Sequence, residues 1–264
     1  MSATYLDGIL EYHRARSAND PRQWRERPVS RSQRASFLSA ISDHRELGIS
    51  VIAEIKRRSP SKGWLAENLD ALDTARRYVA GGAVAISVLT DETHFSGSLD
   101  DLRAVSAGVD VPVLRKDFTV SPNDVLDAVE AGASAVLLIV AALSTDELTE
   151  LLAVAREFSV DALVEVHDHE EARRAVDLGA VLVGVNQRDL HSFEVDTRRA
   201  EAVLSSLGTS IVAVAESGFS SIEAVVRAAH VGFDAVLVGE NFVRSSDPEA
   251  AVASFSGHLI GARQ

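Results

Sequence analysis

Acidic and basic residues follow short apolar segments at several places in this chain of 264 residues. The first of these segments, residues 51–55, is rich in β-branched residues and predicts a buried strand. Glu54 and Lys56 stand two residues apart at its carboxyl end, so alternation along a strand points both side chains to one face. A carboxylate beside an ammonium group makes a poor core, but it suits the binding of an anion and the transfer of a proton.

Polar residues recur at the carboxyl ends of the later apolar segments. They include Thr90, Asp91, Lys116, Glu165, Asn186, Arg188, Glu216, Ser217 and Gly239. The amino ends of the same segments carry mostly Gly, Ala and Ser. A salt bridge with a basic surface loop would account for the first pair, but charges that only solvate a surface should occur at both ends. The asymmetry therefore predicts one site built from the carboxyl ends.

The spacing of the apolar segments predicts the elements that position these residues. Strand candidates begin near Val51, Val84, Val111, Ala135, Ala162, Val181, Ile211 and Ala235. They are roughly 20–35 residues apart and alternate with amphipathic helices, as βα units do. Eight such units predict a single (β/α)8 TIM barrel of the α/β class over residues 49–264. A doubly wound open sheet is the alternative, weakened because no G-x-G-x-x-G turn follows the first strand.

Capping residues place the starts of several helices. The predicted starts are Ser121 before Pro122, Ser144 with Glu147, and Ser220 with Glu223. In the last of these helices, Ile222, Val226 and Ala229 are the expected buried stripe.

Residues 1–48 precede the first strand and are expected to form an N-terminal helical extension of the barrel, within one domain overall. Their apolar stripes are Leu6, Ile9 and Leu10, followed by Phe37, Leu38, Ile41 and Leu47. Between the stripes, residues 19–32 are polar and predict a loop. The arginines between Arg14 and Arg34 are expected to be solvated.

Composition narrows the classes of partner and compartment. The chain has no cysteine, which excludes disulfides and thiolate nucleophiles and fits a cytoplasmic protein. A formal net charge of −13 argues against nucleic acid and anionic membranes as partners. We find no signal-peptide pattern and no apolar run near the ~20 residues of a membrane helix. Lysines at strand ends of an acidic protein suggest a local pocket for a small anion.

Glycines near the end of the barrel indicate a phosphate site. Ser217 and Gly218 follow the seventh predicted strand, and Gly239 follows the eighth. Glycines at such turns let backbone N–H groups approach an oxyanion. These two loops are also the usual phosphate site of such barrels.

A metal site at His167 and His169, with Glu165 two residues earlier, is the weaker of two interpretations. Asp168 and Glu171 have the spacing of a helix start, which would leave both histidines at the surface. We therefore predict no metal.

Six motifs carry a resemblance to a known family. They are residues 53–63 (AEIKRRSPSKG), 114–118 (LRKDF), 163–165 (LVE), 184–190 (GVNQRDL), 215–218 (AESG) and 238–239 (VG). Together they resemble the indole-3-glycerol phosphate synthase family of tryptophan biosynthesis over about residues 50–245, and the preceding extension also fits. The resemblance implies ring closure of 1-(2-carboxyphenylamino)-1-deoxyribulose 5-phosphate to indole-3-glycerol phosphate, CO2 and water. It also implies a carboxy-lyase without a metal or organic cofactor, with neighbouring tryptophan-pathway enzymes as candidate partners.

The same resemblance implies roles for individual residues. Lys116 would be the general acid that protonates the substrate carbonyl, and Glu165 would be the acid/base residue that removes the hydroxyl as water. Glu54, Lys56 and Asn186 complete the implied catalytic set, the first two by orienting and polarising the substrate. The implied substrate-binding residues are Arg188, Ser217, Gly218, Gly239, Glu240, Glu216, Ser59, Pro60, Phe95, Phe118 and Leu190.

Two departures and two rival functions accompany the resemblance. Arg58 replaces a small residue, and Glu240 stands where many members have a small hydroxyl residue, so only its backbone N–H is expected to face phosphate. The related barrel phosphoribosylanthranilate isomerase would carry an early cysteine, which this chain lacks. A phosphate-binding scaffold that had lost its chemistry should lack Lys116 or Glu165, and both are present.

Overall fold

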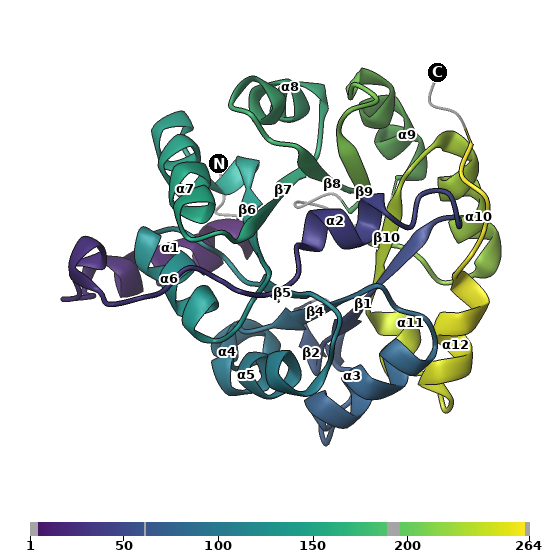
Figure 1. Ribbon diagram of the computed structural model, residues 1–264, viewed down its shortest axis with the longest axis horizontal. Helices are drawn as coiled ribbons and strands as arrows, with labels where there is room; N and C mark the ends of the chain where they lie inside the picture. Colours follow the sequence, from purple (N-terminus) through teal and green to yellow (C-terminus); the bar gives the residue numbers. More distant parts are fainter. Residues whose placement is uncertain (1–4, 61, 189–195, 262–264) are drawn as a thin grey trace.

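The computed structural model describes residues 5–60, 62–188 and 196–261 of the chain. Within these residues, eight parallel strands close into a barrel in the order β1-β10-β9-β8-β7-β6-β5-β4 (Figure 1). They are β1 (Ser50–Ile55), β4 (Ala85–Leu89), β5 (Val113–Lys116), β6 (Ala135–Ile139), β7 (Asp161–Val166), β8 (Leu182–Asn186), β9 (Val212–Glu216) and β10 (Ala235–Val238). Because β1 pairs with both β4 and β10, the sheet is closed and the doubly wound alternative is wrong. The predicted (β/α)8 barrel is confirmed.

A helix packs outside the barrel after each strand (Figure 1). These helices are α3 (Ala71–Ala80), α5 (Leu99–Gly108), α6 (Pro122–Glu130), α7 (Thr145–Glu157), α8 (His169–Asp177), α9 (Thr197–Ser206), α10 (Ile222–Val231) and α12 (Pro248–Phe255). Shorter elements lie in the loops that follow the strands: β2 (Arg58–Ser59), β3 (Gly63–Trp64), α4 (Glu92–Phe95), η2 (Val140–Ala142) and α11 (Glu240–Val243). Across the described residues, every helix is too short or too polar to cross a membrane.

Two of the predicted helix starts are confirmed. Ser144 and Glu147 form a capping box at α7, with both of its hydrogen bonds present. Ser121 caps α6 and Pro122 is its first residue, as predicted. In both helices a side-chain oxygen accepts a hydrogen bond from a backbone N–H that would otherwise have no partner within the helix.

The third predicted start is one residue too early. Ser221, not Ser220, accepts a hydrogen bond from the backbone N–H of Ala224. Ile222 is 41% exposed and Val226 is only partly buried, so the predicted stripe is also wrong. The buried face of α10 consists of Val225, Ala228 and Ala229. A shift of one residue turns the face of a helix by about 100°, and two adjacent serines can both serve as caps.

The N-terminal extension contacts both ends of the barrel. Its elements are α1 (Tyr5–Ala18), η1 (Trp24–Glu26) and α2 (Phe37–Ser42). α1 lies beside α6 and α7, whereas α2 lies across the barrel opening formed by the amino ends of the strands (Figure 1). Ile9, Phe37 and Ile41 are buried as predicted, but Leu47 is 67% exposed because it follows α2 in a turn.

The arginines of the extension are not merely solvated, contrary to expectation. Arg27 has a side chain that is only 9% exposed, and it forms ion pairs of 2.7 Å with Asp127 and 2.6 Å with Glu130. Arg14 pairs with Glu147 of α7 at 2.6 Å. These contacts fasten the extension to the outer helices α6 and α7.

The amino ends of the strands also carry charge, which the composition of those ends did not suggest. Asp161 accepts hydrogen bonds from the Ser36 hydroxyl and from the backbone N–H of Leu38. Asp234 is 1% exposed, accepts a hydrogen bond from the backbone N–H of Ala213, and pairs with Arg45 at 2.7 Å. These carboxylates hold α2 and its following turn against the barrel.

Candidate active site

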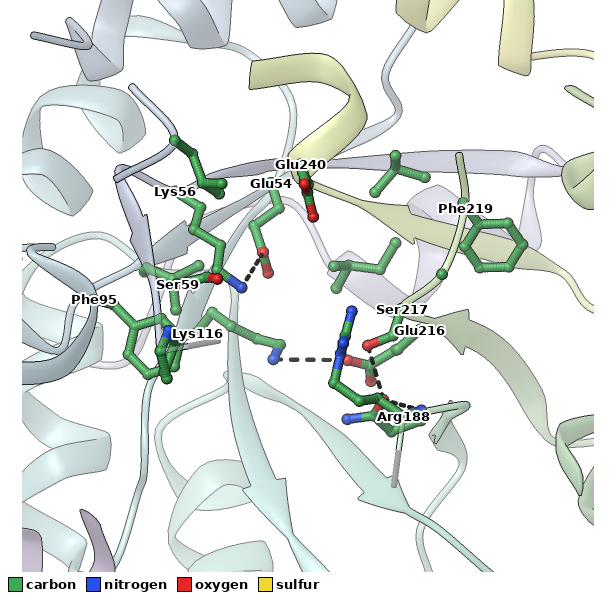
Figure 2. Close-up of a pocket in the computed structure, with 18 of the residues that line it drawn as sticks. Glu54, Lys56, Ser59, Phe95, Lys116, Arg188, Glu216, Ser217, Phe219 and Glu240 are labelled. Atoms are coloured by element: carbon green, nitrogen blue, oxygen red, sulfur yellow. Dashed lines mark hydrogen bonds and ion pairs between the residues drawn. The ribbon is translucent and has the colours of Figure 1, made fainter. Parts of the chain in front are cut away.

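A cavity of about 780 Å³ opens at the carboxyl ends of the strands (Figure 2). It is lined by every described residue to which the family resemblance gives a role, namely Glu54, Lys56, Ser59, Pro60, Phe95, Lys116, Phe118, Glu165, Asn186, Arg188, Glu216, Ser217, Gly218, Gly239 and Glu240. Leu190 lies outside the described residues. Thr90 and Asp91 also follow a strand, but they are buried outside the cavity lining.

The chain contains three lysines, and all three line this cavity. The Nζ atom of Lys116 lies 3.7 Å from a carboxylate oxygen of Glu165 and 3.7 Å from one of Glu216. Lys56 lies 3.7 Å from Glu54 in the same way (Figure 2). These separations exceed an ordinary hydrogen bond of about 2.9 Å, so the ammonium groups can still turn N–H donors toward a ligand.

Glu165 and Glu216 reach one ammonium group from β7 and β9, and their protonation differs. Burial would raise the pKa of Glu165, but the charge of Lys116 and then that of His167 outweigh it and lower the pKa. Burial and the charge of Glu165 raise the pKa of Glu216 well above its ordinary value. The surroundings therefore shift the two pKa values in opposite directions, so that Glu165 favours its ionised form and Glu216 favours its protonated form.

The two catalytic lysine candidates are also in different states. Burial lowers the pKa of Lys116, but the charges of Glu165, Glu216 and Glu54 outweigh it and raise the pKa above its ordinary value. Burial lowers the pKa of Lys56, and the charge of Lys116 adds to that effect against the opposing charge of Glu54. Lys116 is thus the more firmly protonated of the two.

Asn186 joins the carboxylate cluster to the loop after β9. Its Nδ2 donates a 3.2 Å hydrogen bond to Glu165. Its Oδ1 accepts hydrogen bonds from the Ser217 hydroxyl at 2.9 Å and from the backbone N–H of Arg188 at 3.0 Å. Ser217 has φ 70° and Gly218 has φ 83°, so two successive residues take the left-handed conformation in this turn.

Two glycines give the buried carboxylates room. A Cβ atom on Gly239 would lie 2.7 Å from Oε1 of Glu54, and one on Gly184 would overlap Oε1 of Glu216. Packing against Glu54 therefore requires glycine at position 239 whether or not this loop binds phosphate. Sequence reasoning missed Gly184 because the residue that occupies its space is distant in the chain.

Glu240 directs its carboxylate toward cations at the mouth of the cavity. Its Oε1 lies 2.9 Å from Nζ of Lys62 and 3.3 Å from Nε of Arg244. Both partners line the cavity, and Arg244 was not singled out from the sequence. Arg58, the other departure from the family pattern, is exposed.

The two histidines after β7 have different surroundings. Asp168 caps α8 through the backbone N–H of Glu171, which confirms the predicted helix start. His169 is exposed, but His167 is only 8% exposed, so its predicted surface position is wrong. The His167 ring lies between Glu165, at 3.5 Å, and Glu171, at 3.1 Å.

The extension contributes to the cavity, which the sequence did not reveal. Leu6 and Ile9 of α1 line it. Further along α1, the fully buried His13 places Nε2 2.9 Å from Asp91, whose same oxygen lies 2.8 Å from Nδ1 of His94. These three side chains are close enough to hold a metal ion, but their direct contacts are hydrogen bonds that fasten α1 to the barrel.

Comparisons with known proteins agree with this geometry. The family described as indole-3-glycerol phosphate synthase matches residues 9–255. A protein of that name from a Nocardioides species is 53% identical over 213 residues, which cover 81% of this chain and 82% of the relative. Another protein of that name, from Mycolicibacterium gilvum, is 47% identical over 259 residues, which cover 96% of this chain and 93% of the relative.

Solved structures resemble the chain at the level of the fold alone. The structure of 3-hexulose-6-phosphate synthase from Salmonella typhimurium has a TM-score of 0.62 at 14% sequence identity, and the match covers 80% of this chain and 98% of that one. So low an identity carries no information about the reaction.

Proposed function

The chain belongs to the indole-3-glycerol phosphate synthase family of carboxy-lyases, and we propose that Lys116 and Glu165 carry its reaction. In that reaction, 1-(2-carboxyphenylamino)-1-deoxyribulose 5-phosphate closes to indole-3-glycerol phosphate with loss of CO2 and water. The observation that carries the proposal is the half-buried ammonium group of Lys116, held between Glu165 and Glu216 at the carboxyl end of the barrel.

Lys116 has the properties of the general acid. Attack of the aryl carbon on the substrate carbonyl places negative charge on the carbonyl oxygen, which an ammonium group stabilises and then neutralises by giving a proton. The raised pKa of Lys116 keeps it protonated until substrate arrives. The incoming carbonyl oxygen would enter the 3.7 Å spaces around Nζ.

Glu165 has the properties of the acid/base residue in the dehydration. Its lowered pKa keeps it ionised before substrate binds, so it must take up a proton before it can help the hydroxyl leave as water. The arriving substrate carboxylate would favour that uptake, because a nearby like charge raises the pKa of a carboxyl group.

Binding of the substrate requires cations for its two anionic groups. Lys56, Lys116 and Arg188 supply them, and Asn186 with Glu54 orients the reacting portion. Ser217, Gly218 and Gly239 would hold the phosphate together with the backbone N–H of Glu240. The pairing of Glu240 with Lys62 supports this, because it directs the carboxylate to a cation at the mouth.

Aromatic side chains line the part of the cavity beside Lys56. The Phe95 and Phe118 ring centroids lie 6.3 Å apart, and Lys56 Nζ lies 5.2 Å from the Phe95 ring. These rings would pack against the aryl group of the substrate. Ser59 and Pro60, from the loop after β1, would close the cavity beside them. The roles of Leu190, a cytoplasmic location, cofactor independence and association with neighbouring pathway enzymes stay predictions.

The test is fluorescence-monitored conversion of the carboxyphenylamino-deoxyribulose phosphate by the wild-type protein and by Lys116→Met, with and without EDTA. We expect indole product from the wild type, unchanged by EDTA, and a loss of about 10²–10⁴-fold in kcat in the variant. Lys62→Met removes a lysine from the mouth of the same cavity and should keep most of kcat. Binding without product formation by the wild type would contradict the proposal, and loss of activity with EDTA would indicate a metal.

A further inference from the structure

His167 stands beside the proposed acid/base residue but does not line the substrate cavity. It follows β7 directly and is two residues from Glu165, so both side chains leave the strand on the same face. Nε2 of His167 lies 3.5 Å from Oε1 of Glu165. Among the described residues, this buried Nε2 has no hydrogen-bond partner.

Glu171 fixes the orientation of the His167 ring. One oxygen of Glu171 accepts a 2.7 Å hydrogen bond from the backbone N–H of His167 and lies 3.1 Å from Nδ1 of the ring. With a hydrogen on Nδ1 directed to Glu171, the opposite nitrogen is held toward Glu165. A carboxylate bonded to one ring nitrogen of a histidine commonly fixes which nitrogen faces the other partner.

The charges around His167 favour its protonated form. Glu165 faces it from β7, and Glu171 and Asp168 face it from α8 and its cap. Burial lowers the pKa of His167, but the Glu171 hydrogen bond and the neighbouring carboxylates outweigh it and raise the pKa. Beyond Glu165, Asn186 contacts Oε1 at 3.2 Å, and Lys116 approaches Oε2 at 3.7 Å.

The reaction consumes one proton in each turnover. The substrate carboxylate leaves as neutral CO2 and the hydroxyl leaves as water, so charge balances only if one proton enters. Ring closure takes a proton from Lys116 and dehydration takes one through Glu165. One proton returns, to the neutral amine of Lys116, when the ring carbon loses its hydrogen. A group beside Glu165 that already carries a proton would supply the extra proton while substrate fills the cavity.

We propose that His167, held by Glu171, is a positioning residue that stores this proton for Glu165. The proposal rests on the function proposed above. In the step, the Nε2–H bond of the imidazolium breaks and an O–H bond forms at Oε1 of Glu165, which leaves neutral imidazole with its hydrogen on Nδ1. Glu165 then gives its proton to the departing hydroxyl. After product leaves, solvent reaches the open cavity and returns one proton through Glu165 to Nε2.

The test compares kcat and KM for His167→Gln and the wild type between pH 6 and pH 9. Glutamine has a similar size and can donate a hydrogen bond to Glu165, but it cannot give up a proton. We expect KM to change less than about twofold, and kcat to fall by about tenfold at pH 8, within the range of general acid–base effects. The difference in kcat between the variant and the wild type should shrink toward pH 6, where solvent protonates Glu165 more readily. His169→Gln, an exposed histidine of the same segment, is the matched control and should behave as the wild type.

A second variant keeps the proposal testable if His167→Gln does not fold. Glu171→Gln can still accept the backbone hydrogen bond but removes the charge that favours the imidazolium. Its kcat should begin to fall at a lower pH than that of the wild type, with KM unchanged. An unchanged pH profile in this variant would overturn the proposal.

The other outcomes separate this proposal from the proposed function. No indole product from the wild type would overturn both. Product from the wild type with an equal deficit for His167→Gln at every pH would indicate a purely structural role and overturn the proton store alone. A deficit that grows with pH in Glu216→Gln, but not in His167→Gln, would also overturn it, because the stored proton would then belong to Glu216.

Discussion

Buried or half-buried carboxylates lie at both ends of this barrel, but their contacts differ. At the amino ends, Asp161 and Asp234 accept close hydrogen bonds of 2.7–2.9 Å from backbone N–H groups and a serine hydroxyl. At the carboxyl ends, Glu54, Glu165 and Glu216 face lysines at 3.7 Å. The protein itself supplies close hydrogen-bond partners to the first set, whereas the 3.7 Å separations leave hydrogen-bonding positions of the second set available to a ligand.

The cations follow the same division. All lysines line the cavity, and arginines make the ion pairs that fasten the extension and the amino end, such as Arg27 with Asp127 and Arg45 with Asp234. A guanidinium group forms fixed hydrogen bonds and keeps its proton, whereas an ammonium group can give one up when its surroundings change. At Asp161 and Asp234, close contacts hold the fold together, whereas the 3.7 Å contacts of Lys56 and Lys116 leave these two ammonium groups able to bind a ligand.

The largest expected effect comes from replacing Lys116 with arginine, the residue type that forms the ion pairs of the extension and the amino end. Lys116→Arg keeps a positive charge between Glu165 and Glu216 but removes a proton that can be transferred. We expect kcat to fall by at least about 10²-fold, while affinity for a substrate analogue changes much less. Steady-state kinetics and calorimetric titration measure the two quantities. A variant with near wild-type kcat would show that Lys116 only binds.

An intermediate effect, on stability, is expected at the end of the barrel formed by the amino ends of the strands. Asp234→Ala removes the partner of Arg45 and of the buried backbone N–H of Ala213. We expect the free energy of unfolding to fall by about 2–3 kcal/mol, because hydrogen bonds to a charged group are lost and a buried donor is left unpaired. Urea denaturation measures the change, with kcat as the control. If kcat falls while stability is kept, the division between the two ends is wrong.

The smallest effect is a pH-dependent gain of stability in the cavity. The folded state raises the pKa of Glu216 well above 4.5, so above about pH 4.5 the folded protein keeps a proton that the unfolded chain has released. The wild type therefore loses stability as pH rises from 4.5 toward the raised pKa, at about 1.4 kcal/mol per pH unit at most.

Glu216→Gln abolishes this titration. The variant should gain stability relative to the wild type as pH rises above about 4.5, by at most about 1.4 kcal/mol per pH unit. Urea denaturation at several pH values measures the difference, in which the other carboxylates cancel. An advantage that does not depend on pH would mean that Glu216 is not protonated in the folded state.

Much of the barrel could be predicted because the required information is local. Each of the eight barrel strands begins within two residues of its predicted start, since short apolar runs and glycine turns lie in the strand or directly beside it. The polar residues after the strands also converge as expected, because parallel strands in a closed barrel bring all their carboxyl ends to one rim. Where two local signals were equivalent, as for Ser220 and Ser221, the prediction failed.

Contacts between distant segments escaped prediction. The burial of His167 depends on Glu165 and Glu171, which hold its ring between β7 and α8. The partner of His13 is Asp91, which is 78 residues away, and nothing at either position indicates the other. The sequence predicts solvated arginines in the extension for the same reason: their carboxylate partners lie far away in the chain, on α6 and α7.

The sequence by itself determined the (β/α)8 fold, the family and the set of chemical groups at the rim, because these follow from periodicity and from motifs that are contiguous in the chain. Only the tertiary structure decided which of those groups are charged. The protonation of Glu165 and Glu216 depends on distances of a few ångströms to Lys116 and on burial inside the closed barrel. Electrostatic energies at such distances change steeply with position, and no residue carries that information alone.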